Sequence, residues 1–264
     1  MNSYEKLLHQ KYAFIYDFAR LRLPQYVIDT AGKYLPDQPR QVVDLGCGTG
    51  LSAEAWAKHG CKVIGVDIRE DMLAVAESKN LDGVSFLLSD AADTGIESQW
   101  ADVVLCSQSF QWMDQNRLQK EVKRILKPGG LFFVLRYFLM PIGSYEVGRC
   151  FFDFIQAVNA YIRRSNENVQ PYPRKASGPD RESLLLNGTF RFAHSLSFTN
   201  SEYVTAERFV AMALSQGKVY SSMLHADLQL TEEFFAFSEA AEELFRGEGQ
   251  DLEFSYTLDI GIYE

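Results

Sequence analysis

The sequence predicts an α/β fold with a doubly wound, mostly parallel sheet and helical insertions. Between residues 41 and 138, short apolar runs alternate with segments of helical periodicity. Strands that are apolar on both sides are typical of a parallel sheet, and right-handed crossovers cover both of its faces with helices. Two later segments, 190–199 and 251–263, alternate polar and apolar residues and bring the expected strands to seven.

The elements follow in order along the chain. The expected strands of the first part are 41–45, 61–67, 84–90, 101–109 and 131–138. The expected helices between them are 52–60, 69–80 and 116–130, the last one ended by Pro-Gly-Gly. Residues 4–20 carry an amphipathic helical stripe, and Pro24 opens a second helix that Pro36 ends. Segments 141–168 and 201–246 are mostly helical, and the first is rich in aromatic residues.

Composition excludes several classes of protein. The chain has 264 residues, a formal net charge of −9 and a pI near 5.1, which argues against a general grip on nucleic-acid phosphates. Cys47, Cys61, Cys106 and Cys150 have neither redox nor metal-ligand spacing, so we expect free thiols in a reducing cytoplasm. The polar N-terminus has no apolar signal region, and no run approaches the ~20 apolar residues of a membrane span.

The stretch VVDLGCGTGL, residues 42–51, has three glycines, Gly46, Gly48 and Gly50, directly after an expected strand. Glycines between a strand and a helix are typical of a nucleotide site at the carboxyl edge of a sheet. A dinucleotide fingerprint would keep a glycine at position 51, but Leu51 stands there and the last glycine is Gly50. No Lys or Arg follows Gly46 within the stretch, which also disfavours a pyrophosphate and hence a nicotinamide oxidoreductase.

Residues 44–50, DLGCGTG, resemble the first motif of the class I S-adenosylmethionine-dependent methyltransferases. Four further segments resemble the motifs that follow in that family, in the same order: VIGVDIREDML (63–73), LLSDAADT (87–94), ADVVLCSQSFQWMD (101–114) and LKPGGLFFV (126–134). The segments SFQWMD and ARLRLPQY are similar to the small-molecule branch that includes trans-aconitate and ubiquinone/menaquinone methyltransferases. The resemblance implies a Rossmann-like sheet whose last strand is antiparallel, and S-adenosylmethionine as cofactor.

Asp67 stands 23 residues after Asp44, at the end of the second strand, where a carboxylate can accept both ribose hydroxyls. The cofactor carries a sulfonium and an ammonium, so acids such as Asp44 suit it better than basic residues. The resemblance assigns cofactor binding to Asp44, Gly46, Cys47, Gly48, Asp67, Ile68, Met72, Asp90, Ala91, Ser107 and Gln108. Simpler roles stay open: the three acids could cap turns or helices, and Ile68 and Met72 could be core residues.

Methyl transfer from a sulfonium is an in-line displacement, so the protein mainly aligns the reactants and excludes water. A carboxylate acceptor needs no base, whereas a hydroxyl or carbon acid does. The sequence contains no pattern that indicates which residue would be this base. The four histidines are scattered without metal-ligand spacing, so we expect metal-free chemistry.

Candidate residues for the acceptor site are Tyr16, Arg20, Trp112 and Arg136. Arg20 or Arg22 could instead meet the cofactor carboxylate, and Trp112 could be a core residue. Arg136, in an apolar strand, must be paired or face a cleft, so it either grips an acidic acceptor or forms a structural ion pair. The basic stretch 163–181 is expected as a surface loop, or as a region that attracts an anionic acceptor.

The expected organisation is an N-terminal helical cap (1–40), a cofactor-binding core (41–140), helical lid insertions (141–189 and 200–250) and the last two core strands (190–199 and 251–264). The predicted function is methyl transfer to a small metabolite, an anionic one included, without nucleic-acid or membrane partners and as a monomer or homodimer. Two alternatives remain: a methyltransferase acting on tRNA or protein, and a non-catalytic protein that holds the cofactor or its demethylated product. SQSFQWMD stands where a base-flipping N-P-P-Y motif would be, which favours the small acceptor.

Overall fold

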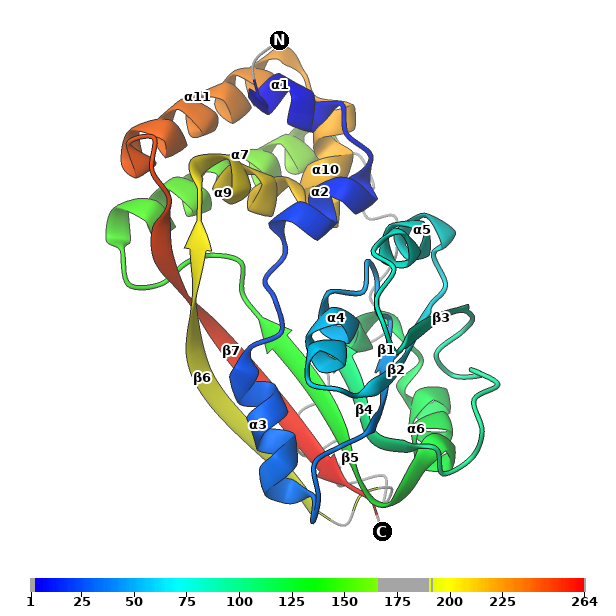
Figure 1. Ribbon diagram of the computed structural model, residues 1–264. Helices are drawn as coiled ribbons and strands as arrows, with labels where there is room; N and C mark the ends of the chain where they lie inside the picture. Colours follow the sequence, from blue (N-terminus) through cyan, green and yellow to red (C-terminus); the bar gives the residue numbers. More distant parts are fainter. Residues whose placement is uncertain (1–2, 166–189, 191, 264) are drawn as a thin grey trace. The chain divides into compact units, whose positions relative to one another are not determined.

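The computed structural model describes residues 3–165, 190 and 192–263 (Figure 1). Within these residues, seven strands form one sheet in the order β3-β2-β1-β4-β5-β7-β6. Neighbours among β1 to β5 pair in parallel, and β7 pairs antiparallel with β5. The strands are β1 Gln41–Leu45, β2 Lys62–Asp67, β3 Val84–Leu88, β4 Ala101–Ser107, β5 Leu126–Tyr137, β6 Phe192–Val204 and β7 Gln250–Ile262. The predicted fold class is therefore confirmed.

The helices of the described residues also follow the expected order. They are α1 Ser3–Leu8, α2 Tyr12–Ala19, α3 Gln25–Tyr34, α4 Leu51–Lys58, α5 Glu70–Ser78, the 3₁₀ turn η1 Phe110–Trp112, α6 Gln115–Ile125, α7 Tyr145–Ser165, α9 Ala206–Leu214, α10 Gly217–Leu224 and α11 Leu228–Phe245. The chain divides into two compact units. Among the described residues, the first unit holds 3–21, 138–165 and 199–255, and the second holds 22–137, 190, 192–198 and 256–263.

Three expected boundaries were wrong. The stripe over 4–20 is broken between α1 and α2, where the Tyr220 hydroxyl donates to the Gln10 carbonyl oxygen that a continuous helix would have used itself. α6 ends at Ile125, and the following residues join β5, because Leu126 is extended and pairs with Ala101. β6 continues past 199 to Val204, so the next helix begins only after Thr205, whose side chain accepts the backbone N–H of Arg208.

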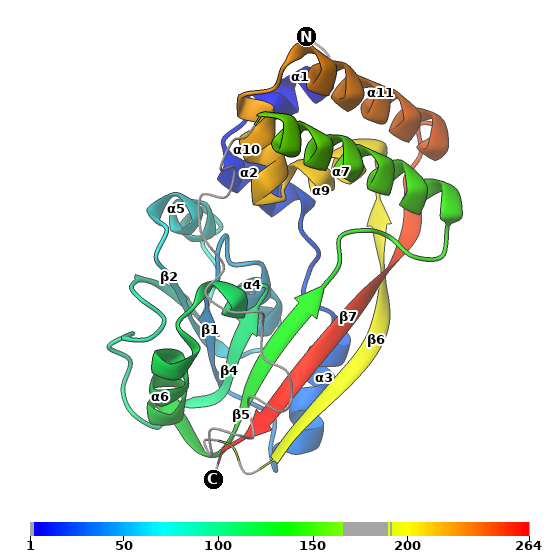
Figure 2. The same ribbon diagram turned by 180° about the vertical axis from the view of Figure 1, so that it is seen from behind.

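The second unit packs helices on both faces of its sheet: α3 and α4 lie on one face and α6 on the other (Figures 1 and 2). The Asp114 side chain caps α6 by accepting the N–H groups of Asn116 and Arg117. Leu118 and Val122 of α6 are buried in one cluster with Val43 and Leu45 of β1, and each buried aliphatic side chain contributes roughly 1.5–3 kcal/mol. Since successive strand residues point to opposite faces, Asp44 faces the side of α4.

The first unit is held by an aromatic core. α7 packs against α11 and α10 (Figure 2), and the rings of Phe154 and Phe237 stack with centroids 4.6 Å apart. The ring centroid of Phe151 lies 5.5 Å from that of Phe209 and 6.4 Å from that of Phe237. The aromatic stripe predicted for this segment is thus largely a packing surface between helices, in which aromatic pairs add about 0.5–1.5 kcal/mol each beyond burial.

Candidate functional site

The turn between β1 and α4 lies at the carboxyl edge of the sheet. Gly46, Gly48 and Gly50 have φ values of +70°, +55° and +78°, which other residues rarely adopt. The N–H groups of Gly46 and Cys47 donate to the Val66 carbonyl oxygen at 2.7 and 3.0 Å, which fastens the turn to β2. The sequence therefore predicted the glycines correctly as a turn next to a strand end.

Packing within the protein also requires two of these glycines. A Cβ at Gly46 would lie 2.4 Å from Cβ of Ser109, and one at Gly50 would lie 3.0 Å from the Phe86 ring. The Ser109 hydroxyl donates to the Leu45 carbonyl oxygen at 2.6 Å, so the segment after β4 is tied to the end of β1. Ser109 is not among the residues predicted from the sequence, where its signal is its position two residues beyond Ser107.

Asp67, the last residue of β2, binds the glycine turn. Its Oδ2 accepts the Gly48 N–H at 2.8 Å, and its Oδ1 accepts the Arg69 N–H at 2.9 Å. Burial raises the pKa of Asp67, and these hydrogen bonds oppose the rise. The residue that caps α5 is Arg69, so Asp67 is not the helix N-cap. Its half-buried oxygens keep lone pairs that can accept hydroxyl groups of a ligand.

Asp44 is fully buried beside the turn, with its backbone paired between Gly65 of β2 and Leu105 of β4. Neither oxygen of its carboxyl group has a hydrogen-bond partner within the described part of the chain. Burial, and then the charge of Asp67, raise the pKa of Asp44 to about 7, while the N–H of Ala53 in the first turn of α4 opposes the rise. A turn-capping role would show as a hydrogen bond from the glycine turn to the Asp44 carboxyl group, and the described residues form none.

A second buried polar atom lacks a partner in the same turn. The Thr49 side chain is 0% exposed, and its hydroxyl oxygen has no hydrogen-bond partner in the ranges that the structure describes. Buried polar groups are normally satisfied. The unsatisfied Asp44 and Thr49 therefore mark the place where β1 meets α4 as a site whose polar groups await a ligand or solvent.

The remaining predicted cofactor residues fall into two groups by exposure. Ile68 is 66% exposed, directly after β2, whereas Met72, Ala91 and Cys47 are buried. Ile68 is thus not a core residue, and Met72 packs in the interior of the second unit. The buried Cys47 thiol has its pKa raised by burial, then by the charges of Asp44 and Asp67, so it stays neutral.

Asp90 caps its own turn and remains accessible. Its Oδ1 accepts the Ala92 N–H at 2.9 Å, and its Oδ2 lies 3.4 Å from Nη1 of Arg117. The Asp90 side chain is 55% exposed. The capping alternative for this acid is therefore observed, and the accessible carboxylate is also free to meet a ligand.

The end of β4 is joined to the end of β5. The Gln108 N–H donates to the Leu135 carbonyl oxygen at 2.9 Å, and Nε2 of Gln108 donates to the Tyr137 carbonyl oxygen at 2.6 Å. Gln108 has φ +56°, while Ser107 is half-buried as the last residue of β4. The Gln108 side chain is thus anchored, and its backbone forms this part of the carboxyl edge.

Arg136 forms an ion pair with Asp259, as one of its two interpretations proposed. Nη2 of Arg136 lies 2.7 Å from Oδ2 of Asp259, which is 1% exposed. The Ser195 hydroxyl donates to the other oxygen of Asp259, so one network joins β5, β7 and β6. The Arg136 side chain is still 38% exposed. Trp112, in η1 of the same unit, is 41% exposed and is therefore not a core residue.

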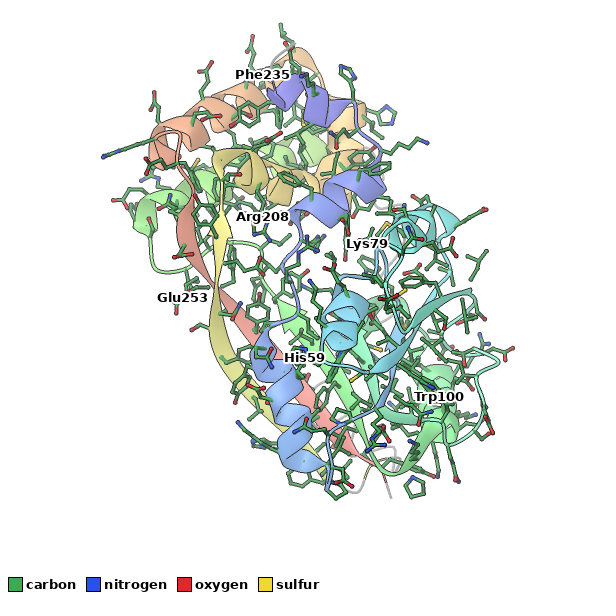
Figure 3. The ribbon with its side chains drawn as sticks, viewed as in Figure 1. His59, Lys79, Trp100, Arg208, Phe235 and Glu253 are labelled. Carbon is green, nitrogen blue, oxygen red and sulfur yellow. The ribbon has the colours of Figure 1, made fainter. Side chains whose placement is uncertain are left out.

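The other two acceptor candidates lie together in the first unit. Cζ of Arg20 is 4.6 Å from the centre of the Tyr16 ring, a cation–π contact. Nη2 of Arg20 and the Tyr12 hydroxyl both donate to the Ser215 carbonyl oxygen at 2.8 Å. Arg208, labelled in Figure 3, donates to the carbonyl oxygen of Arg20. The end of α2 is thus held against the α9–α10 corner.

The basic stretch 163–181 lies largely outside the described residues; within them, Arg164 pairs with Asp227 at 2.7 Å. Nδ1 of His59, labelled in Figure 3, makes a hydrogen bond with the Ala55 carbonyl oxygen at 2.9 Å. The described ranges contain no group of three or more His, Cys, Asp or Glu side chains placed to hold a metal. No helix within them is long and apolar enough to cross a membrane.

Residues 43–134 match the family model described as a methyltransferase domain. A methyltransferase of Mycobacterium bovis, itself uncharacterised, is 35% identical over 107 residues, 40% of this chain and 44% of the relative. A ubiquinone biosynthesis O-methyltransferase of Coxiella burnetii is 34% identical over 110 residues, 38% of this chain and 47% of the relative. The chain thus spans less than half the length of these relatives.

Two solved structures share the fold. A candidate type II methyltransferase from Anaeromyxobacter dehalogenans has a TM-score of 0.62 and 18% identity, with 93% of this chain and 97% of that chain covered. Phosphoethanolamine N-methyltransferase 2 of Haemonchus contortus, solved in complex with S-adenosyl-L-methionine, has a TM-score of 0.52 and 17% identity, with 100% of this chain and 60% of that chain covered. At these identities the likeness establishes the arrangement of strands and helices.

Proposed function

We propose that this chain is an S-adenosylmethionine-dependent methyltransferase that acts on a small metabolite. The observation that carries the proposal is the glycine turn of residues 46–50, which is hydrogen-bonded to Asp67 and follows the strand that contains the unsatisfied carboxyl group of Asp44. The match of residues 43–134 to a methyltransferase domain supports it, because the matched segment contains this turn and both acids. So does the presence of S-adenosyl-L-methionine in a structure of the same fold.

The site's donors and acceptors fit this cofactor. Asp67 would accept the ribose hydroxyls, Ile68 and the accessible Asp90 would meet the adenine, and the turn would hold the methionine portion. Asp44 supplies negative charge for the cations of the cofactor. The stretch 46–51 contains no Lys or Arg, which a phosphate-bearing cofactor would call for.

When bound, S-adenosylmethionine supplies a methyl group that is activated by the positive sulfur. The chain would align the acceptor in line with that methyl group and exclude water. For the acceptor we propose a small, anionic molecule, contacted in the second unit by Trp112 and Arg136. Tyr16 and Arg20, which belong to the first unit, stay candidates from the sequence. The exposed part of the Arg136 guanidinium and the exposed Trp112 ring support this role. The ubiquinone biosynthesis enzyme, a relative by sequence, is named for a small-molecule pathway.

We further propose a cytoplasmic protein without nucleic-acid or membrane partners, as a monomer or a homodimer. Its four cysteines are free thiols, which suits a reducing compartment. The net charge of −9 disfavours binding to nucleic-acid backbones.

The test begins with calorimetric titration of S-adenosylmethionine into the wild type and into Asp67→Ala. We expect at least a tenfold loss of affinity, about 1.4 kcal/mol, because the ribose would lose its acceptor. The matched control is Asp71→Ala, four residues along, whose 54% exposed side chain pairs with Arg69 and should leave affinity unchanged. Equal affinity of Asp67→Ala and the wild type, with the fold intact by circular dichroism, would contradict the ribose assignment.

Incubation with methyl-labelled S-adenosylmethionine and a fractionated metabolite pool, followed by mass detection, then tests catalysis. We expect label in a small anionic product. Label in tRNA or protein alone would favour the macromolecular alternative, and binding without any transfer would favour a non-catalytic cofactor-binding protein.

A further inference from the structure

Asp44 is a buried acid without a partner. Its side chain is 0% exposed, and both carboxyl oxygens lack a hydrogen bond among the described residues. An ionised carboxylate in such a place is costly unless a cation or several donors compensate it. The geometry therefore favours a protonated Asp44 in the free protein.

The groups around Asp44 reinforce this. From β2 the Asp67 carboxylate repels its charge, and from β4 the Cys106 thiol, whose own pKa is raised by burial and by Asp44, stays neutral. From the turn the Cys47 thiol is likewise neutral. From α4 the Ala53 backbone N–H favours the anion. Arg69, a base beside Asp67, is engaged by another acid, since it pairs with Asp71.

The proposed cofactor and its product differ by one charge. S-adenosylmethionine carries an ammonium, a carboxylate and a sulfonium, so its net charge is positive. S-adenosylhomocysteine has lost the sulfonium charge and is neutral overall. In a site that is poorly screened by solvent, this difference in charge acts strongly on a buried acid beside the ligand.

We propose that Asp44 gives up its proton when the positively charged donor binds, and that the resulting carboxylate makes the site distinguish the donor from its neutral product. Donor binding is then coupled to proton release, whereas product binding leaves Asp44 largely protonated. After methyl transfer the carboxylate loses its counter-charge, which weakens retention of the product. This inference rests on the proposed function, since it concerns the same site.

The test is calorimetric titration of the full chain with S-adenosylmethionine and, separately, S-adenosylhomocysteine at pH 6.0, in buffers of different protonation enthalpy. With a pKa of about 7, Asp44 is largely protonated at pH 6, so the donor should release about half a proton or more beyond the product. The difference should vanish by about pH 8.5, where Asp44 is already ionised. At pH 6.0 the amino groups of both free ligands are protonated, so they do not contribute to the difference.

Asp44→Asn should abolish the difference in proton release and lower donor affinity at least about threefold more than product affinity. Asp67→Asn is the matched control, and it should lower the affinities of both ligands by a similar factor. It should also keep the difference in proton release, which moves to lower pH because the charge of Asp67 raises the pKa of Asp44. Should Asp44→Asn fail to fold, the pH series on the wild type decides alone.

Equal proton release by the two ligands, or a difference that persists in Asp44→Asn, would overturn the inference while leaving the proposed function intact. Absence of binding by either ligand to the wild type would overturn both.

Discussion

At the scale of single residues, the glycine turn serves the protein as much as a ligand. From the sequence, Gly46 is expected to let a cofactor approach the bare backbone. The structure adds that Gly46 has a left-handed conformation and lies against Ser109, which is itself hydrogen-bonded to the end of β1. A substitution at this position is therefore expected to destabilise the fold, whether or not a ligand is bound.

Gly46→Ala should destabilise the chain by about 2–4 kcal/mol, because the new methyl group must share space with Cβ of Ser109, 2.4 Å away, in an unfavourable backbone conformation. The matched control is Gly60→Ala: its φ is also positive, +78°, but nothing lies within 4 Å of the added Cβ. That variant should pay only the conformational cost of about 1 kcal/mol. Urea unfolding of the two variants checks this, and equal losses would show that the Ser109 contact is readily relieved.

At the scale of elements, one charged network joins three strands. Arg136 of β5 pairs with Asp259 of β7, and Ser195 of β6 donates to the same acid. The sequence flagged Arg136 as a lone base in an apolar strand. The matching signal, Asp259 as a lone acid in the apolar run of residues 258–262, was visible but lies 123 residues away, and no local pattern links the two.

Arg136→Met should destabilise the chain by about 2 kcal/mol, a value between the costs of breaking a buried and an exposed ion pair. The value is intermediate because Asp259 is buried and Arg136 is only partly buried. Adding Asp259→Asn should recover part of the loss, since it removes the uncompensated charge. Thermal unfolding of the single and double variants measures this coupling. A double variant less stable than Arg136→Met would contradict a simple ion pair.

At the scale of the whole molecule, the sheet was predictable and several residue-level details of the site were not. Apolar strands alternating with helices determine a parallel sheet, and glycines at the end of β1 mark its carboxyl edge. The break between α1 and α2 was missed because the amphipathic stripe continues through it. The roles of Ser109, Asp259 and Ser195 depend on contacts between distant strands and loops, which periodicity does not encode.

Two buried or partly buried acids give the molecule opposite dependences on pH. Arg124 hydrogen-bonds Glu121 and, with Thr94, lowers the pKa of that carboxyl group to about 2. Its stabilisation is therefore present above the unfolded value near 4.5 and is lost as pH falls toward 2. Asp44 has the opposite sign: its pKa rises from 3.8 to about 7, so the folded state binds more protons and stability falls as pH rises from about 4 to 7.

The ligand-free protein should consequently be most stable on the acid side of neutrality, near pH 4.5–5, and less stable at pH 7.5. Thermal unfolding midpoints between pH 3 and 8.5 test this. Asp44→Asn should flatten the alkaline side and raise the midpoint at pH 7.5 while changing little at pH 3, because the unfolded acid is largely protonated there. Glu121→Gln should flatten only the acid side. The contrary result is a wild-type midpoint that rises steadily to pH 7.5 and that Asp44→Asn does not change. It would mean that Asp44 is already ionised in the free protein, because an ionised Asp44 causes no loss of stability over this pH range.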